Sequence, residues 1–326
     1  MRKLIAVLLL CLFIPSGLQA QGNSLETRDV EVRVYLIDIE RIDTVSQNFT
    51  ANLTLVFRWK DPSLAHTGPG PISMPLDNIW FPRIQILNQQ RLVSTLPREA
   101  EVHPDGGVVQ RQRFWGNLSQ PLDLREFPFD SQRLQVRLAN VGFDEELVNL
   151  IPSPDSKISA SMTIPDWEVT GWESFPKELT LDDDSDGLKG IVLSVDVKRD
   201  IAFFKYKVIF PLILIVMMSW MVFWIDPTLV ASQISLSITA MLTMIAYRFA
   251  LAGMMPRLGF LTILDHFVLA STVVVFLSMA EVIYTAHLST SDQLEKARKV
   301  DRNARWIAPV VYFAMATETL FLRIGL

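Results

Sequence analysis

A stripe of hydroxyl and apolar side chains follows one face of a hydrophobic segment in the C-terminal half of the chain. Its members recur every three or four residues, which is the spacing that places side chains on one face of a helix: Ser235, Thr239, Leu242, Ala246 and Phe249. Hydroxyls can replace part of the hydration shell of a passing ion, and a ring of apolar side chains closes a narrow path by excluding water. The stripe is therefore what a helix lining a narrow pore would show. Taken alone, it favours the seam of an ordinary membrane bundle, where Ser and Thr hydrogen-bond between helices, and the rest of the chain reverses that order.

Other residue types that carry chemistry do not form a catalytic pattern. The sequence has no G-x-S-x-G and no H-E-x-x-H, and its four histidines show no metal-ligand spacing. We therefore expect no enzyme and no cofactor. Asp182, Asp184 and Asp186, followed by Gly187, match the opening of a calcium loop, but Leu193 stands where the closing acid is needed. These three acids are a weak divalent candidate, and a solvated hairpin tip is the alternative.

The composition divides the chain into an exported part and a membrane part. Of 326 residues, 50% are hydrophobic and the mean hydropathy is +0.28, which is too apolar for an ordinary soluble protein. Residues 1–20 read as a secretory signal, with Arg2 and Lys3 ahead of a short apolar run and Ala20 before the cut. The only cysteine, Cys11, lies within it, so the mature chain contains no disulfide.

The charges are distributed unevenly between the two parts. Residues 21–200 contain 18 basic and 28 acidic side chains, a net charge of −10, whereas residues 201–326 contain 10 basic and 7 acidic, a net charge of +3. An acidic exported domain raises the local concentration of cations. This charge favours a partner or permeant ion of positive sign.

Residues 21–200 predict an all-β domain. Short segments rich in Val and Ile alternate with polar residues and are separated by turn signals, including Gly68 to Pro71 and His103 to Gly107. The clearest segments are Val30 to Ile39, Asn52 to Trp59, Val108 to Phe114, Leu134 to Leu138, Trp167 to Trp172 and Ile191 to Val197. We expect an immunoglobulin-like β-sandwich of about ten strands. Trp167 and Trp172 are expected in its core.

Residues 201–326 predict a four-helix transmembrane bundle. The apolar segments cover about 203–225, 228–255, 260–285 and 306–326, each long enough to cross a bilayer core of about 30 Å. Five basic residues between Lys296 and Arg305 place the last connection inside. The sandwich then lies outside, and we expect a multi-pass protein of the cell (inner) membrane.

Several motifs resemble the pentameric ligand-gated ion channels, also called Cys-loop receptors. Phe127-Pro128-Phe129-Asp130 followed by Gln132 resembles their signature loop, although the flanking cysteines are absent near Gln120 and Leu134, as in the bacterial branch. Further resemblances are Arg58 to Pro62, Trp80-Phe81-Pro82, Ser219-Trp220, Thr239 to Thr243 and Met255 to Leu258. Neither the acid of cation-selective relatives nor the Pro-Ala-Arg-like pattern of anion-selective relatives stands at Val230 to Gln233.

The resemblance implies roles for specific residues. An agonist pocket between subunits would contain Phe175, Leu188, Val141 and Phe143, where aromatic faces suit cationic amines. A gating interface between the sandwich and the helices would contain Asp43, Phe127, Pro128, Phe129, Asp130, Arg199, Pro256 and Arg257. The pentameric assembly is likewise implied by the resemblance alone.

We therefore expect a homopentameric, agonist-gated ion channel that conducts cations. Its expected partners are further copies of the chain, the lipid bilayer, inorganic ions and a small-molecule agonist, either an amine or protons, with no nucleic acid. An anion-selective channel and a proton-gated channel are alternatives within the family. A membrane-anchored binding module is an alternative from another class, but it does not explain the hydroxylated second helix.

Overall fold

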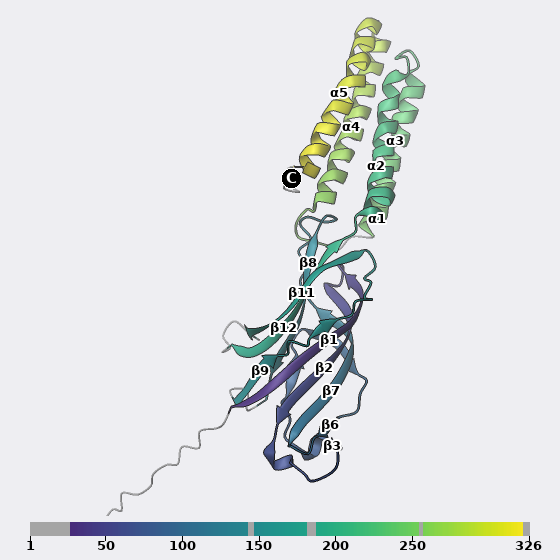
Figure 1. The fold of residues 1–326 in the computed structure, drawn as a ribbon. Helices are drawn as coiled ribbons and strands as arrows, with labels where there is room; N and C mark the ends of the chain where they lie inside the picture. The colour runs from purple at the N-terminus through teal and green to yellow at the C-terminus, as the bar shows by residue number, and fades with distance from the viewer. Residues whose placement is uncertain (1–26, 143–146, 181–186, 254–256, 322–326) are drawn as a thin grey trace, which may run out of the picture.

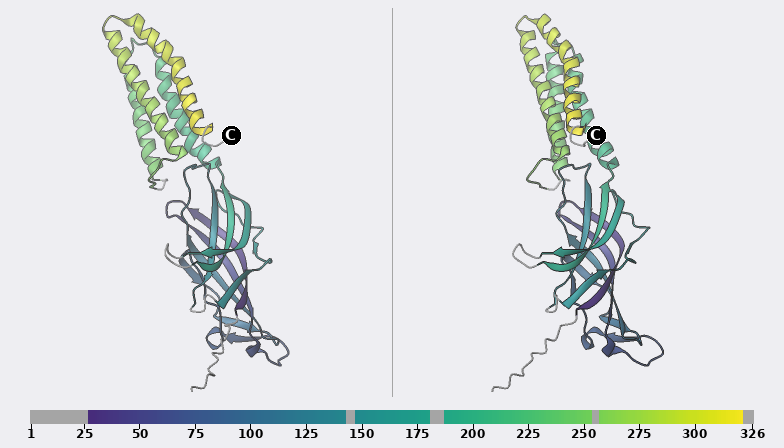
Figure 2. Two further views of the ribbon diagram at one scale, coloured as in Figure 1. Left: turned by 90° about the vertical axis from the view of Figure 1, so that its left-hand side faces the viewer. Right: turned by 60° about the vertical axis from the view of Figure 1, so that its left-hand side comes forward.

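The computed structural model describes residues 27–142, 147–180, 187–253 and 257–321. A β-sandwich forms one end of the molecule and a bundle of helices projects from it (Figure 1). The turn between the last two helices lies at the end of the bundle farthest from the sandwich, as the two further views also show (Figure 2). The predicted signal peptide, residues 1–20, lies outside the described residues.

The larger sheet has the strand order β10–β1–β2–β7–β6–β3, with β5 paired to β7 and β9 paired to β1. Its strands are β1 (Arg28–Asp43), β2 (Asn48–Lys60), β3 (Ile72–Pro75), β5 (Gln89–Ser94), β6 (Glu99–Val102), β7 (Gly107–Ser119), β9 (Val148–Pro152) and β10 (Lys157–Ile158). The long antiparallel pairing of β1, β2 and β7 arises from alternating apolar residues, because every second side chain faces the core.

The smaller sheet has the order β11–β12–β8–β4, with every pair antiparallel. Its strands are β4 (Ile84–Ile86), β8 (Ser131–Asn140), β11 (Trp167–Leu179) and β12 (Leu188–Arg199). The described residues thus form a sandwich of twelve strands, against the ten or so expected. The additional strands are short and lack the alternation that marks the long ones.

The first membrane-type helix is continuous but not regular. It comprises α1 (Ala202–Phe204), a π-helical turn η4 (Lys205–Ile209), α2 (Phe210–Met221) and a 3₁₀ turn η5 (Val222–Trp224). Pro211 is near the start of α2 but inside the continuous helix, where it lacks the N–H that would bond to the preceding turn. The π-helical turn directly precedes this proline.

The remaining helices are α3 (Val230–Ala252), α4 (Ile263–Thr290) and α5 (Leu294–Phe321). Among the described residues, three segments are long and apolar enough to cross a membrane: 202–224, 230–252 and 263–290. Helix α5 packs against α4 but begins at Leu294, twelve residues before the predicted start. Its first half is rich in charged residues, so an apolar run marks only its second half.

Candidate functional site

The junction between sandwich and helices contains a buried pair of opposite charges. Arg199, at the end of β12, donates from Nε to Asp130 Oδ1 at 2.7 Å and from Nη2 to Asp130 Oδ2 at 3.0 Å. The two side chains are only 6% and 2% exposed. A buried pair of this kind is stable only when its geometry is good and its remaining atoms are partnered.

Neighbouring residues supply those partners. Gln132 donates from Nε2 to Asp130 Oδ2 at 2.7 Å. The Arg199 guanidinium lies over the rings of Trp167 at 4.1 Å and Phe127 at 4.8 Å from the ring centroids. The charge is therefore held by a carboxylate through two hydrogen bonds and by the faces of two aromatic rings.

The same loop contacts two helices of the bundle. The Phe127 ring packs edge-on against Phe204 of α1, with the centroids 4.9 Å apart. The Phe127 carbonyl accepts a hydrogen bond from the backbone N–H of Leu264 at 3.2 Å, close to the start of α4. A displacement of the loop from Phe127 to Asp130 would therefore be transmitted directly to α1 and α4.

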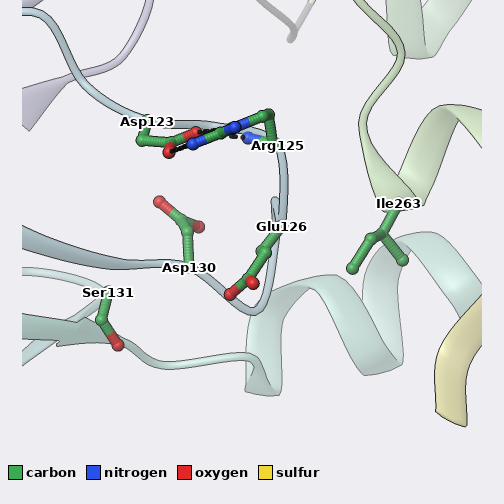
Figure 3. A pocket seen from close by; sticks show the side chains of 6 residues that line it. All are labelled: Asp123, Arg125, Glu126, Asp130, Ser131 and Ile263. Carbon is green, nitrogen blue, oxygen red and sulfur yellow. Dashed lines mark hydrogen bonds and ion pairs between the residues drawn. The ribbon is translucent and has the colours of Figure 1, made fainter. Parts of the chain in front are cut away.

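A cavity of about 470 Å³ lies beside this junction. Figure 3 shows Asp123, Arg125, Glu126 and Asp130 along the loop, with Ile263 facing them from the start of α4. Arg125 pairs with Asp123 through two side-chain nitrogens, and its guanidinium holds the pKa of that carboxyl below its usual range. The cavity wall therefore combines a satisfied ion pair with the exposed side chain of Glu126.

Not every predicted member of the gating interface joins this cluster. Asp43 accepts hydrogen bonds from the backbone N–H groups of Ser46 at 2.9 Å and Val45 at 3.0 Å. The Ser46 bond is the main cause of a lowered pKa of Asp43. Asp43 thus caps its own turn rather than pairing with Arg199. Arg257 is exposed, and Pro256 lies outside the described residues.

The remaining predicted residues of this loop differ in their burial. Phe127 and Pro128 are buried and joined by a cis peptide bond, and Phe129 is half-buried. Together with Asp130 and Arg199, they form one contiguous contact between the end of the sandwich and the helices.

The predicted pore stripe is exposed on α3. Ser235, Thr239, Leu242, Ala246 and Phe249 are all exposed in the single chain, and Leu242 and Phe249 are 61% and 77% exposed. The side chains that α3 buries in the bundle are Gln233, Ser237, Ala240, Met244 and Leu251. At about 100° per residue, the two sets lie roughly 170° apart around the helix. The stripe therefore faces away from the rest of the chain.

The predicted agonist residues lie near the free end of the β11–β12 hairpin. Phe175 and Leu188 are half-buried and pack on one small cluster formed by Ala139, Leu179 and Val192. The backbone N–H of Val141 donates to the Arg83 carbonyl at 3.0 Å, just beyond β8. Phe143 lies outside the described residues, as do the divalent candidates Asp182, Asp184 and Asp186.

Sequence reasoning missed several contributors and misplaced one tryptophan. The missed residues are Phe204, Gln132 and Leu264, which the fold brings to the junction. Of these, Gln132 belongs to the signature-loop motif that begins at Phe127. Trp167 is buried as expected, but it also supports Arg199. Trp172 is 40% exposed, so its assignment to the core is wrong. Its strand β11 lies at the edge of the smaller sheet and alternates toward solvent.

Comparison with known proteins decides the family. The neurotransmitter-gated ion-channel ligand binding domain matches residues 19–199, and the neurotransmitter-gated ion-channel transmembrane region matches residues 208–294. The chain belongs to the neurotransmitter-gated ion-channel family. It is thus a membrane protein of the Cys-loop superfamily, and this family consists of ligand-gated channels, not enzymes.

Two curated relatives support this membership. The chain is 27% identical over 302 residues to gamma-aminobutyric acid receptor subunit rho-3 of Homo sapiens, covering 85% of this chain and 62% of the relative. It is 25% identical over 271 residues to gamma-aminobutyric acid receptor subunit beta-4 of Gallus gallus, covering 79% of this chain and 55% of the relative. This neurotransmitter-gated channel chain therefore spans about six tenths of the length of these relatives.

Proposed function

We propose that this chain is a subunit of an agonist-gated ion channel, with α3 lining a central pore between five identical copies. The observation that carries the proposal is the exposed α3 stripe, which lies opposite the face that α3 buries in its own bundle. Lipid tails can cover Leu, Ala and Phe, so the hydroxyls of Ser235 and Thr239 in the same row are what favour a water-filled path over lipid. A ring of further copies around such a path accommodates both the polar and the apolar part of the row.

The proposed gating step runs through the buried junction. Agonist binding near Phe175 and Leu188 would shift the β11–β12 hairpin, and β12 ends at Arg199. Arg199 is fixed to Asp130, and the adjoining Phe127 contacts both α1 and α4. The ligand shifts a closed–open equilibrium only to the extent that it binds the open state better.

The proposed agonist is a small amine. The half-buried Phe175 ring offers an aromatic face for a cationic group. Both relatives are named as receptors for gamma-aminobutyric acid, whose amino group fits that chemistry, so this compound comes first in an agonist panel. Protons are the second member of the panel because the sandwich is rich in carboxylates.

The permeant ion could be a cation or an anion, and a separate observation supports each proposal. The net charge of −10 on residues 21–200 supports cation conduction, because it concentrates cations at the outer mouth. Anion conduction is the second candidate. It is supported by α3 itself, which contains no carboxylate from Val230 to Ala252.

The experiment that tests the function is current recording from cells that express the chain, with uninjected cells as the control. A current evoked by an amine or by acid supports a channel, and its reversal potential in a salt gradient assigns the sign of the ion. Leu242→Ser should ease opening and lower the agonist concentration for half-maximal current, because a hydroxyl wets the apolar neck. An unchanged response would remove Leu242 from the gate, and silence to the whole panel would favour the binding-module alternative.

A further inference from the structure

Two carboxyl groups meet inside the helical bundle, toward the end farthest from the sandwich. Glu281 of α4 and Asp301 of α5 bring their carboxyl groups next to each other. Asp301 is fully buried. Gln233 of α3, also fully buried, donates from Nε2 to Asp301 Oδ2 at 3.2 Å and to the Ile225 carbonyl at 2.9 Å. Three helices thus converge on one pair of acids.

The cluster has more hydrogen-bond acceptors than donors. Both Oε atoms of Glu281, Oδ1 of Asp301 and Oε1 of Gln233 are buried without a donor. Two ionised carboxylates have no hydrogen to offer each other. A hydrogen bond between them therefore requires that one of the two carries a proton.

The surrounding charges do not provide an alternative partner. Among the described residues, neither Glu281 nor Asp301 forms an ion pair: Arg298 bridges to Asp226 at 3.3 Å, and Arg305 donates to the Phe223 carbonyl at 2.7 Å. Asp226, in the turn before α3, adds a further negative charge that acts on Asp301, and Arg305 opposes it. Helix α3 contributes the neutral Gln233. Like charges in contact and out of water are strongly unfavourable, so a shared proton is the low-energy state.

We propose that Glu281 and Asp301 share one proton, and that this proton fastens α4 and α5 to the pore-lining helix α3 through Gln233. Loss of the proton would leave two like charges in contact, and their repulsion would push α4 and α5 apart at the point where Asp301 accepts from Gln233. Ser235, on the exposed face of α3, lies only two residues beyond Gln233. The site would therefore link proton concentration at this end of the bundle to the polar end of the pore stripe. The link to gating, unlike the shared proton, rests on the proposed channel function.

The direct test is infrared spectroscopy of the purified full chain, compared with Glu281→Gln. The wild type should show the carbonyl band of a protonated carboxyl at pH 7, and this band should be missing from Glu281→Gln and from Asp301→Asn, which serves if the first variant fails to fold. Glu295→Gln is the matched control because Glu295 lies on α5 with its side chain 93% exposed, and it should leave the band unchanged. Identical spectra for all four proteins would overturn the proposal.

A second measurement follows thermal unfolding with pH. In the folded protein the pair keeps one proton, whereas in the unfolded chain both carboxyls lose theirs above the ordinary carboxyl pKa range. Wild-type stability should therefore fall as pH rises from 6 to 9. The fall should be smaller in Glu281→Gln. If added sodium or calcium stabilises the wild type at fixed pH while no carboxyl band is present, the oxygens hold a cation and the proton is refuted.

Current recording then separates the two proposals. In the wild type, a pH change on the side of the α4–α5 turn should shift the half-maximal agonist concentration by about fivefold or more, and Glu281→Gln should abolish the shift. A pH-independent current in both proteins, with the carboxyl band present, would overturn the link to α3. Absence of any current would count against the channel function alone, because the infrared result does not depend on conduction.

Discussion

Replacing Asp130 by Asn removes one charge from the buried junction while it preserves the shape of the side chain. Arg199 would keep its place beside Trp167 and Phe127, but the amide NH2 of Asn would face a donor that now bonds to Asp130, either Arg199 or Gln132. Among the described residues, Asp130 is the carboxylate paired with Arg199, whose side chain is 6% exposed. The perturbation therefore leaves a buried charge unpaired and adds one unmatched donor.

The expected cost is large. Breaking a buried pair by removing one partner destabilises a fold by about 3–5 kcal/mol. The aromatic faces around Arg199 retain about 1 kcal/mol of cation–π attraction, so the lower end of that range is expected. For a domain of the size of this sandwich, about 3 kcal/mol corresponds to a fall in melting temperature of roughly 6–12 °C.

The assay is thermal unfolding of the purified chain, with Asp196→Asn as the matched control. Asp196 accepts from Arg133 Nε at 2.7 Å, the same distance as in the buried pair, but these side chains are 37% and 56% exposed. Exposed pairs contribute about 0–1 kcal/mol, so the control should barely change the melting temperature. Equal shifts for the two substitutions would refute the argument that burial decides the cost. Adding Arg199→Gln to Asp130→Asn should recover part of the loss.

Three further predictions concern stability. Thr262→Ala should cost about 1 kcal/mol, because Thr262 and Asp265 form a reciprocal capping box at the start of α4, measurable as a lower melting temperature. Gly116→Ala should cost at least about 1–3 kcal/mol, since Gly116 has φ +146° and an added Cβ would lie 1.9 Å from a backbone oxygen, whereas Gly70→Ala should be neutral because nothing surrounds it. Asp43→Asn should cost more stability at pH 7 than at pH 3, because a carboxyl with a lowered pKa stabilises the fold above its ordinary pKa and loses that effect as pH falls through the folded pKa.

Each of these has a result that would contradict it. A Thr262→Ala protein that melts with the wild type would show that tertiary packing alone fixes the start of α4. Equal melting temperatures for the two glycine variants would dismiss the steric argument at Gly116. Parallel pH–stability curves for Asp43→Asn and the wild type would mean that the turn does not depend on the ionised carboxylate.

Local pattern determined the elements of this protein. The six predicted strand segments lie within β1, β2, β7, β8, β11 and β12 because alternation of side chains is a property of neighbouring residues. The exposed face of α3 was likewise predictable, since helical period alone places Ser235 and Leu242 on one stripe. The apolar repeat does not continue into the first half of α5, which is polar, so the sequence pattern did not predict that half of the helix. Tertiary packing rather than hydropathy stabilises it there.

Only the tertiary structure decided which distant residues meet. Asp130 and Arg199 are 69 positions apart, and their pairing depends on the register of β8 against β12. Glu281 and Asp301 lie on different helices, and each is unremarkable in the sequence. Contacts of this kind depend on how strands and helices pack, and that packing is set by the whole core rather than by the residues that make the contact.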